Sequence, residues 1–396
     1  MSNQTNASAG ATLVRQATIV TFVLLCVMHQ ASQPGGGVAA EPKPKALASE
    51  LVSRLGHEEF AERERAAADL IALELDASAA LKIGTKSQDR EIRHRSAKLL
   101  ALIAEIDLER RFERFKNDTD PDSDYGLPAW DAYREVVGDS PGARSLFVSM
   151  HEDESRLLGQ VQDNPKQLGD ALAIRCDQLR GQAMFERIPI RLGTTATLLF
   201  VSTRDDVEAT PLVHSFVYAV CSGSGFQAAI ESGPLQESLV TLTERWIARQ
   251  PASGISEALD VGLANGLKGC LPRAREVFAS PVATISDRIY ACLCVARFGD
   301  ESDFSRLEAY LADVNICAKA QVGGQVVDTE LRDIALAGLV RLAKLEPKDF
   351  GFDRLAFDRK RFFELSSLGF PDEQSRVQAI ALWREYRRSK TEAKAP

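Results

Sequence analysis

Histidine and serine, which often carry catalysis or metal binding, occur in this chain without the spacing that such chemistry needs. No two histidines beyond residue 40 have the separation of a zinc-binding helix, and no Cys-x-x-Cys-His run is present to attach haem. Ser224 follows Ser222, whereas a nucleophile elbow needs glycine two residues before its serine. The Ser-Gly-Ser-Gly run that begins at Ser222 also lacks the lysine of a phosphate-binding loop. We interpret this run as a turn that ends a helix, and we interpret as solvated or hydrogen-bonded the histidines His57, His94, His151 and His214.

Carboxylates are abundant, and two clusters have residue types that could serve catalysis or metal binding. One is the run His151–Glu154, and the other is the alternating series Asp118, Asp120, Asp122 and Asp124. Catalytic carboxylates depend on burial, which a sequence does not show, so solvated acidic surface is the preferred interpretation. The alternating series is loosely similar to a calcium loop, but Ser123 and Ala129 occupy the positions that require glycine and glutamate. We therefore expect no cofactor, no metal ion and no catalytic residue.

A spaced pattern of arginine and apolar residues occurs five times in the chain and predicts a helix at each occurrence. Each copy has an Arg, a small residue three positions on, an apolar or small residue at four, and larger apolar residues at seven and ten. The copies are Arg63/Ala66/Ala67/Leu70/Leu73, Arg93/Ser96/Ala97/Leu100/Ile103, Arg288/Ala291/Cys292/Val295/Phe298, Arg332/Ala335/Leu336/Leu339/Leu342 and Arg376/Ala379/Ile380/Trp383/Tyr386. The first two arginines lie 30 residues apart and the last three lie 44 apart. Such repetition is typical of an all-α solenoid, in which helix pairs bury their apolar faces against their neighbours.

A capping residue is expected four positions before each of these arginines, at Glu59, Asp89, Thr284, Asp328 and Asp372. Glutamate is the poorest fit of the five. An arginine that recurs beside a capping residue suggests a structural ladder between neighbouring repeats, and an anion-binding stripe is the alternative. Other basic side chains fall largely off the core positions and are the candidates for a protein-binding groove: Arg95, Lys98, Arg297, Arg341, Arg384 and Arg387.

The repeats divide the chain into regions. We expect N-terminal repeats over residues 41–110, a helical but unassigned middle region over 111–255, a C-terminal repeat array over 256–388 and a disordered tail over 389–396. Gly323 and Gly324 separate two extended, roughly alternating runs, which predicts one β-hairpin near residues 316–327 inserted into the helical protein.

The N-terminus has the features of a cleavable export signal. Its apolar run, residues 17–28, is shorter than the about 20 residues that a membrane-spanning helix needs. A Pro-Gly-Gly-Gly stretch and small residues then precede Glu41. We expect residues 1–40 to be removed as a signal peptide and the protein to be periplasmic or secreted. The alternative is an uncleaved anchor that tethers the protein to the membrane; lipid attachment at Cys26 is disfavoured by the bulky leucines before it.

The net charge argues against one class of partner, and the cysteine content bears on disulfide bonding. The chain carries a formal net charge of −8, and loss of residues 1–40, with one arginine and no acid, makes it −9. A surface this acidic repels phosphate backbones, so we do not expect a nucleic-acid partner. Six cysteines remain after the signal, and we expect them to be mostly free, buried thiols. Cys292 and Cys294 should not bond to each other, because on a helix they point about 200° apart.

Two of the repeated segments support a family resemblance. The run Asp89-x-x-Ile92-Arg93-x-x-Ser96-Ala97-x-x-Leu100 and its relative Asp328-x-x-Leu331-Arg332-x-x-Ala335-x-x-x-Leu339 resemble the second helix of HEAT repeats. The whole chain resembles exported bacterial HEAT-repeat proteins, although the motifs cover only about a third of it. The resemblance implies an interaction surface and no catalytic residues. The fifth copy departs from the motif, with Ser375 before its arginine, as a capping repeat would.

Three functional hypotheses follow. The leading one is an extracytoplasmic, non-enzymatic scaffold that binds another exported or envelope protein. The second is an enzyme or small-ligand binder whose site lies in residues 111–255. The third is a purely structural envelope component with no discrete partner.

Overall fold

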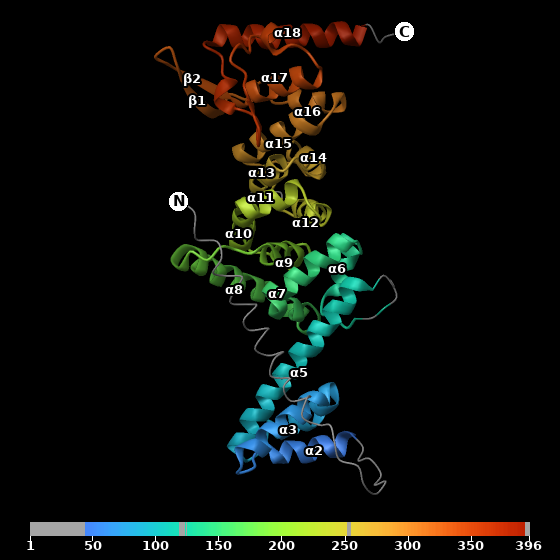
Figure 1. The fold of residues 1–396 in the computed structure, drawn as a ribbon. Coiled ribbons are helices and arrows are strands. Elements are labelled where there is room, and N and C mark those ends of the chain that lie inside the picture. The colour runs from blue at the N-terminus through green and yellow to red at the C-terminus, as the bar shows by residue number, and fades with distance from the viewer. Residues whose placement is uncertain (1–43, 119–122, 124, 252–254, 393–396) are drawn as a thin grey trace, which may run out of the picture. The chain divides into compact units, whose positions relative to one another are not determined.

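The described residues form two mostly helical units, the first within residues 44–117 and the second within residues 118–392 (Figure 1). The computed structural model describes residues 44–118, 123, 125–251 and 255–392. The expected signal peptide therefore lies outside the described residues, as do most of the alternating aspartates between 118 and 124. None of the helices in the described part is long and apolar enough to cross a membrane.

The first unit consists of helices that share one apolar core. Its elements are α2 (Pro44–Arg54), α3 (Phe60–Ala72), the short 3-10 helix η1 (Glu74–Ala77), α4 (Ser78–Gly84) and α5 (Arg90–Asn117). Leu51 of α2 and Leu55, which directly follows this helix, meet Leu70 of α3, Leu81 of α4 and Ile103 of α5 in this core. Because helices in proteins are stabilised mainly by tertiary packing, the burial of these apolar side chains against one another is the main source of stability of the unit.

A small residue in the repeated pattern permits a close helix contact in this unit. Ser96, the third-position residue of the second copy, is fully buried. A Cβ atom added to Gly84 would collide with the Ser96 hydroxyl and would lie only 2.8 Å from a methyl group of Val52. The helices α4 and α5 therefore approach closely where both carry small residues. Ala97, at the fourth position of the same copy, is exposed, so that position does not belong to the core here.

The second unit contains the remaining elements. Its helices are α6 (Trp130–Val137), α7 (Pro141–Asp163), α8 (Leu168–Gly181), α9 (Leu192–Ser202), α10 (Pro211–Cys221), α11 (Ser224–Glu231), α12 (Gln236–Ala248), α13 (Ser256–Ala264), α14 (Leu271–Val277), α15 (Ile285–Phe298), α16 (Phe304–Glu308), α17 (Leu331–Leu342) and α18 (Glu373–Glu392). Short 3-10 or π-helical turns join several of them: η2 (Pro165–Gln167), η3 (Gln182–Glu186), η4 (Lys268–Cys270), η5 (Glu301–Asp303), η6 (Pro347–Phe350) and η7 (Leu365–Ser367). Helix α18 continues through residues 389–392, contrary to the disordered tail expected there, whose last four residues lie outside the described part.

Neighbouring helices in the second unit pack in sequence order. Helix α13 packs against α15, and α15 packs against α17, while α14 and α16 lie against α15 and α17 respectively. The middle region is built around α9, where every residue from Gly193 to Ser202 is buried. A helix that is buried all round has no polar face, which explains why residues 192–202 do not show the amphipathic pattern of the repeats.

Two antiparallel hairpins interrupt the helices. The strands β1 (Ile316–Val322) and β2 (Gln325–Glu330) pair around Gly323 and Gly324, both at positive φ, so the predicted hairpin is confirmed. The second hairpin was not predicted and joins two-residue strands, β3 (Phe357–Asp358) and β4 (Phe362–Phe363). The turn consists of residues 359–361, and Phe362, the first residue of β4, adopts a left-handed backbone (φ 76°). Phenylalanine rarely adopts this conformation, so the sequence carries no signal for it.

Strand β2 also changes the fourth copy of the repeated pattern. Helix α17 begins only at Leu331, so its cap is Glu330 and the expected cap, Asp328, lies in the strand. Asp328 pairs instead with Lys319 on β1, its register partner, at 3.0 Å. Arg332 is therefore the second residue of its helix, whereas the other four repeat arginines are each the fourth residue of theirs. The equal 44-residue spacing consequently does not reflect equal helical positions.

Candidate functional site

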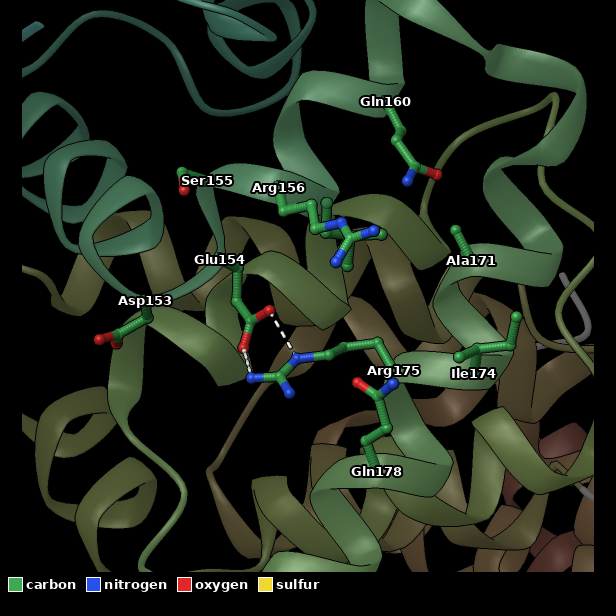
Figure 2. A pocket seen from close by; sticks show the side chains of 10 residues that line it. Asp153, Glu154, Ser155, Arg156, Gln160, Ala171, Ile174, Arg175 and Gln178 are labelled. Atoms are coloured by element: carbon green, nitrogen blue, oxygen red, sulfur yellow. Dashed lines mark hydrogen bonds and ion pairs between the residues drawn. The ribbon is translucent and has the colours of Figure 1, made fainter. Parts of the chain in front are cut away.

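Helix α7 has a break within the run His151–Glu154, whose residue types could serve catalysis. Glu154 has non-helical backbone angles (φ −139°, ψ 36°) in the middle of the helix. His151 and Glu154 are buried, and only 4% of the Asp153 side chain is exposed. The solvated acidic face expected at residues 151–154 is therefore wrong, because Glu152 alone of the four is exposed. Figure 2 shows that Glu154 points toward Arg175 and Asp153 points away from it.

These two carboxylates hold the start of α9. Glu154 accepts two hydrogen bonds from Arg175, each 2.8 Å long, and one from the hydroxyl of Thr194 at 3.0 Å. Asp153 accepts from the main chain of Thr194 and pairs with Arg191 at 2.8 Å. Burial raises the pKa of the Asp153 carboxyl above its usual value, and the charge of Arg191 opposes this effect. Because both acids already have structural partners, their burial is explained without a catalytic role.

A hollow of about 390 Å³ lies between α7 and α8 beside this ion pair (Figure 2). Arg156 and Gln160 border it from α7, and Ile174 and Gln178 border it from α8. Arg156 is exposed and has no partner among the described residues, and 61% of Ile174 is exposed. The hollow is thus an open surface of mixed character that includes one face of α8.

The same helix ends in the most exposed apolar group of the second unit. We define the α8 tip as residues 182–188, which form the π-helical turn η3 and the two residues after it. Met184 is 67% exposed, Phe185 is 85% exposed and Ile188 is 47% exposed. Arg187 adopts a left-handed backbone (φ 55°), which is strained for a residue with a side chain. A π-helical turn and a strained residue together often mark a functional segment.

Basic side chains accompany the α8 tip. Arg187 is exposed and has no partner among the described residues. Arg180, two residues before the tip, lies over the ring of Phe216 at 6.0 Å and has no carboxylate partner in the described part of the chain. Phenylalanine, methionine and arginine are the residue types that protein interfaces favour over ordinary surface. The α8 tip therefore has the composition of a protein-binding surface.

The repeat arginines of the first unit form hydrogen bonds to the loops that precede their helices. Arg63 donates to the main-chain carbonyls of His57 and Glu58, and Arg93 donates to the equivalent carbonyls of Ser87 and Gln88. Asp89 caps its helix by accepting from two main-chain N–H groups, as predicted. The expected cap at Glu59 makes no such bond, because its longer side chain fits the geometry poorly.

The repeat arginines of the second unit differ from one another. Arg376 is almost fully buried and binds both carboxylate oxygens of Asp333 on α17, at 2.7 and 3.2 Å. Arg332 of α17 forms a bidentate pair with Glu373 of α18, at 2.9 and 2.7 Å. Each of the two helices thus contributes an arginine to an acid of the other. Arg288 lies 3.5 Å from Asp313. The caps expected at Thr284 and Asp372 are present.

Three aspartates that were not predicted from the sequence connect neighbouring helices most directly. All three are fully buried: Asp287, Asp303 and Asp333. Each lies three residues after the cap of its helix and accepts a hydrogen bond from the main-chain N–H of that cap residue. The carboxylate of each also binds a group on a second helix or loop. Asp287 accepts from the N–H of Ser256, and Asp303 binds Arg275 at 2.8 and 2.7 Å. The spacing of a cap and an acid three residues later is a capping-box signal that could have found them.

Two of the six candidate protein-binding cations are tied to acids. Arg95 pairs with Glu91 on its own helix at 2.6 Å and with Glu64 on α3 at 2.8 Å. Arg387 pairs with Glu308 at 2.7 Å and lies over an aromatic ring. These two side chains join helices to one another, and a partner would have to displace an internal acid to bind them.

The other four candidates are less constrained. Arg297 donates to two main-chain carbonyls, and Arg341 lies over the ring of Phe362 at 5.8 Å. Lys98 and Arg384 are exposed and have no partner among the described residues. Lys98 belongs to the first unit and the other three belong to the second. The six candidates are therefore divided between the two units, with Arg95 and Lys98 in the first and the other four in the second.

The remaining candidate side chains, the histidines and cysteines, are mostly buried or far apart. Within the described residues, no group of three or more His, Cys, Asp or Glu side chains could hold a metal ion. His151 lies 2.9 Å from the carbonyl of Pro128, and burial lowers the pKa of His214. Five cysteines are buried as free thiols and Cys317 is half-buried, in agreement with the prediction. Burial raises the pKa of the Cys317 thiol to about 12, which makes it a poor nucleophile.

No family model, curated protein or solved structure matches this chain. The function is therefore inferred from its own residues.

Proposed function

We propose that this protein is a non-enzymatic scaffold that binds another protein through the α8 tip. The observation that carries the proposal is the exposure of Phe185, of which 85% is accessible, between Met184 and Arg187. Single exposed apolar side chains are common, but adjacent ones, such as Met184 and Phe185, form an apolar surface of the kind that a partner covers. Aromatic and arginine side chains at the centre of an interface supply most of its binding energy.

The scaffold that presents this surface is proposed to be a HEAT-like solenoid. The sequential packing of α13, α15 and α17 and the buried aspartates at their N-termini support stacked helix pairs in the second unit. The paired arrangement of α2 with α3 and of α4 with α5 supports the same design in the first. We further propose, from the apolar N-terminal run alone, that the chain is exported and that its partner is an exported or envelope protein.

A site-specific photocrosslinking experiment in intact cells tests the proposal. A photoreactive amino acid at position 185 should give one defined crosslinked product. The same amino acid at position 282 should give none, because Val282 is similarly exposed (63%) but belongs to the connection between α14 and α15 and not to the α8 tip. The Arg187→Ser change should weaken the product from position 185 without altering the unfolding midpoint. Equal crosslinking from positions 185 and 282 would refute the proposal.

A small-ligand binder is the second candidate, because the hollow of about 390 Å³ lies within residues 111–255. The size is at the lower end of the range for small-molecule sites. This alternative predicts a compound that raises the unfolding temperature of the wild type but not of an Ile174→Arg variant, in which the new side chain would fill the hollow. Crosslinking at position 185 would be unaffected by such a compound unless the two sites overlap.

A further inference from the structure

We propose that a second cavity in the second unit binds a phosphate group, either free or carried by a small polar molecule. This site is separate from the α8 tip and does not depend on the scaffold proposal. The cavity holds about 610 Å³ and lies among α11, the end of α13, the end of α15 and the β3–β4 hairpin. Sites for small ligands have volumes in this range.

The cavity combines segments that are far apart in the sequence. Ser222, Ser224 and Gln227 come from the α10–α11 connection, Asn265 follows α13, and Arg297 lies near the end of α15. The turn before β4 adds Arg359 and Lys360. The Ser-Gly-Ser-Gly run, which the sequence identified only as a turn, thus faces a basic wall. That wall is invisible in the sequence because its residues lie between 70 and 140 positions further along the chain.

Two cations in this wall have no acid to neutralise them. Arg297 is half-buried, and its described partners are the carbonyl oxygens of Leu263 (2.6 Å) and Lys360 (3.1 Å) and the ring of Phe298. Only one of its terminal nitrogens makes these bonds, so its other N–H groups can donate to a ligand. The ammonium of Lys360 has no partner among the described residues. A dianion placed between these two side chains would receive charge-assisted hydrogen bonds from both.

The acids around the cavity are already neutralised. Glu231 pairs with Arg359 at 2.9 Å at the exposed rim. Asp260 accepts from the hydroxyl of Tyr218 at 2.9 Å and pairs with Arg361 at 3.2 Å. They therefore do not compete with a ligand for Arg297 or Lys360.

A third acid and the start of a helix complete the wall. Asp358 accepts main-chain N–H groups of the turn that carries Lys360, so it fixes the position of that lysine. Helix α11 begins at Ser224 without a side-chain cap, and Ser224 lines the cavity. The N-terminus of a helix attracts an anion through the helix dipole, so this helix start adds to the attraction of the two cations.

An adjoining chamber suggests that the phosphate belongs to a larger molecule. This chamber holds about 370 Å³ and shares Ser222, Gln227 and Lys360 with the main cavity. Its far side carries the Tyr218 hydroxyl and the Asp260 carboxylate, which are suited to the hydroxyl groups of a sugar. A sugar phosphate could therefore place its phosphate at Arg297 and Lys360 and its sugar in the chamber.

Calorimetric titration of the full chain with inorganic phosphate and with ribose 5-phosphate, in low-chloride buffer, tests the site. We expect saturable binding of both, with ribose 5-phosphate binding more tightly if the chamber is used and equally if only the phosphate is held. The Lys360→Gln variant should weaken binding by roughly tenfold, the effect of losing one hydrogen bond to a charged group. Lys348→Gln, the same charge change at an exposed lysine outside the cavity, should leave the affinity unchanged.

A second variant removes the half-buried cation, Arg297. Arg297→Gln should abolish binding, and its fold is checked by circular dichroism because Arg297 also bonds to the main chain. Absence of saturable binding to the wild type would overturn the proposal. Equal weakening by Lys360→Gln and Lys348→Gln would also overturn it, since it would show that only the overall charge matters.

Discussion

Replacement of Arg376 by methionine is expected to destabilise the second unit far more than its position near the chain terminus suggests. Arg376 is 5% exposed and Asp333 is fully buried, so the change leaves a carboxylate in the interior without its cation. Removal of one member of a buried ion pair typically costs about 3–5 kcal/mol. Methionine keeps most of the aliphatic packing of the arginine side chain, so the loss reports mainly on the charge.

The assay is urea unfolding followed by tryptophan fluorescence. All three tryptophans, Trp130, Trp246 and Trp383, lie in the second unit, so the signal is specific to it. Arg384→Met is the matched control, because Arg384 lies on the same helix and is exposed. It should change the free energy of unfolding by less than about 0.5 kcal/mol. The double variant Asp333→Asn/Arg376→Met should recover much of the loss, since it removes the buried charge as well.

The pH dependence of this effect has a definite sign. Burial raises the pKa of Asp333 in the folded protein, and the pairing with Arg376 opposes that rise. Without Arg376 the folded pKa should rise further above the unfolded value, so the folded state takes up a proton more readily than the unfolded state. The penalty of Arg376→Met should therefore shrink as the pH falls from 8 toward 5. A penalty no larger than that of Arg384→Met at pH 8, or one that grows on acidification, would refute the assigned role of the pair.

Two further predictions concern packing. Gly84→Ala should destabilise the first unit by about 1–3 kcal/mol, because the new methyl group would collide with Ser96 and lie 2.8 Å from Val52. Hydrogen exchange of peptides from residues 44–117 measures this loss of stability. The control is Gly159→Ala, where the new methyl group meets open space, and equal protection of these peptides in both variants would contradict the prediction. In the native protein a thiol reagent at pH 7 should modify Cys317 slowly and the five buried cysteines not at all, whereas all six should react after denaturation; rapid labelling of a second cysteine in the native state would show that the core is open.

Some of the fold could be predicted because its signals are local. The apolar spacing after Arg63, Arg93, Arg288 and Arg376 marks helices, since a helix repeats its buried face every three to four residues. Gly323 and Gly324 mark a hairpin, because a tight turn needs positive φ at those positions. The helix α17 begins later than its pattern predicts because strand β2 occupies the residues that would otherwise form its cap.

The candidate sites were harder to predict, because they depend on exposure and on distant neighbours. Phe185 and Leu198 are both apolar helical residues, yet one is 85% exposed and the other fully buried. The acids of residues 151–154 were interpreted as solvated because nothing in their types indicates the break at Glu154 that turns them toward α9. The β3–β4 hairpin has no turn signal, and without it the basic wall facing Ser224 cannot be assembled.

Most helical segments, the glycine hairpin and the small residues that allow helices to meet could be recognised from the sequence. These properties depend on the periodicity and backbone freedom of consecutive residues. The pairing of buried charges, such as Arg376 with Asp333, and the exposure of others, such as Lys360, could be read only from the folded chain. The reason is that burial and electrostatic pairing depend on three-dimensional distance between residues far apart in the chain, which local patterns do not specify.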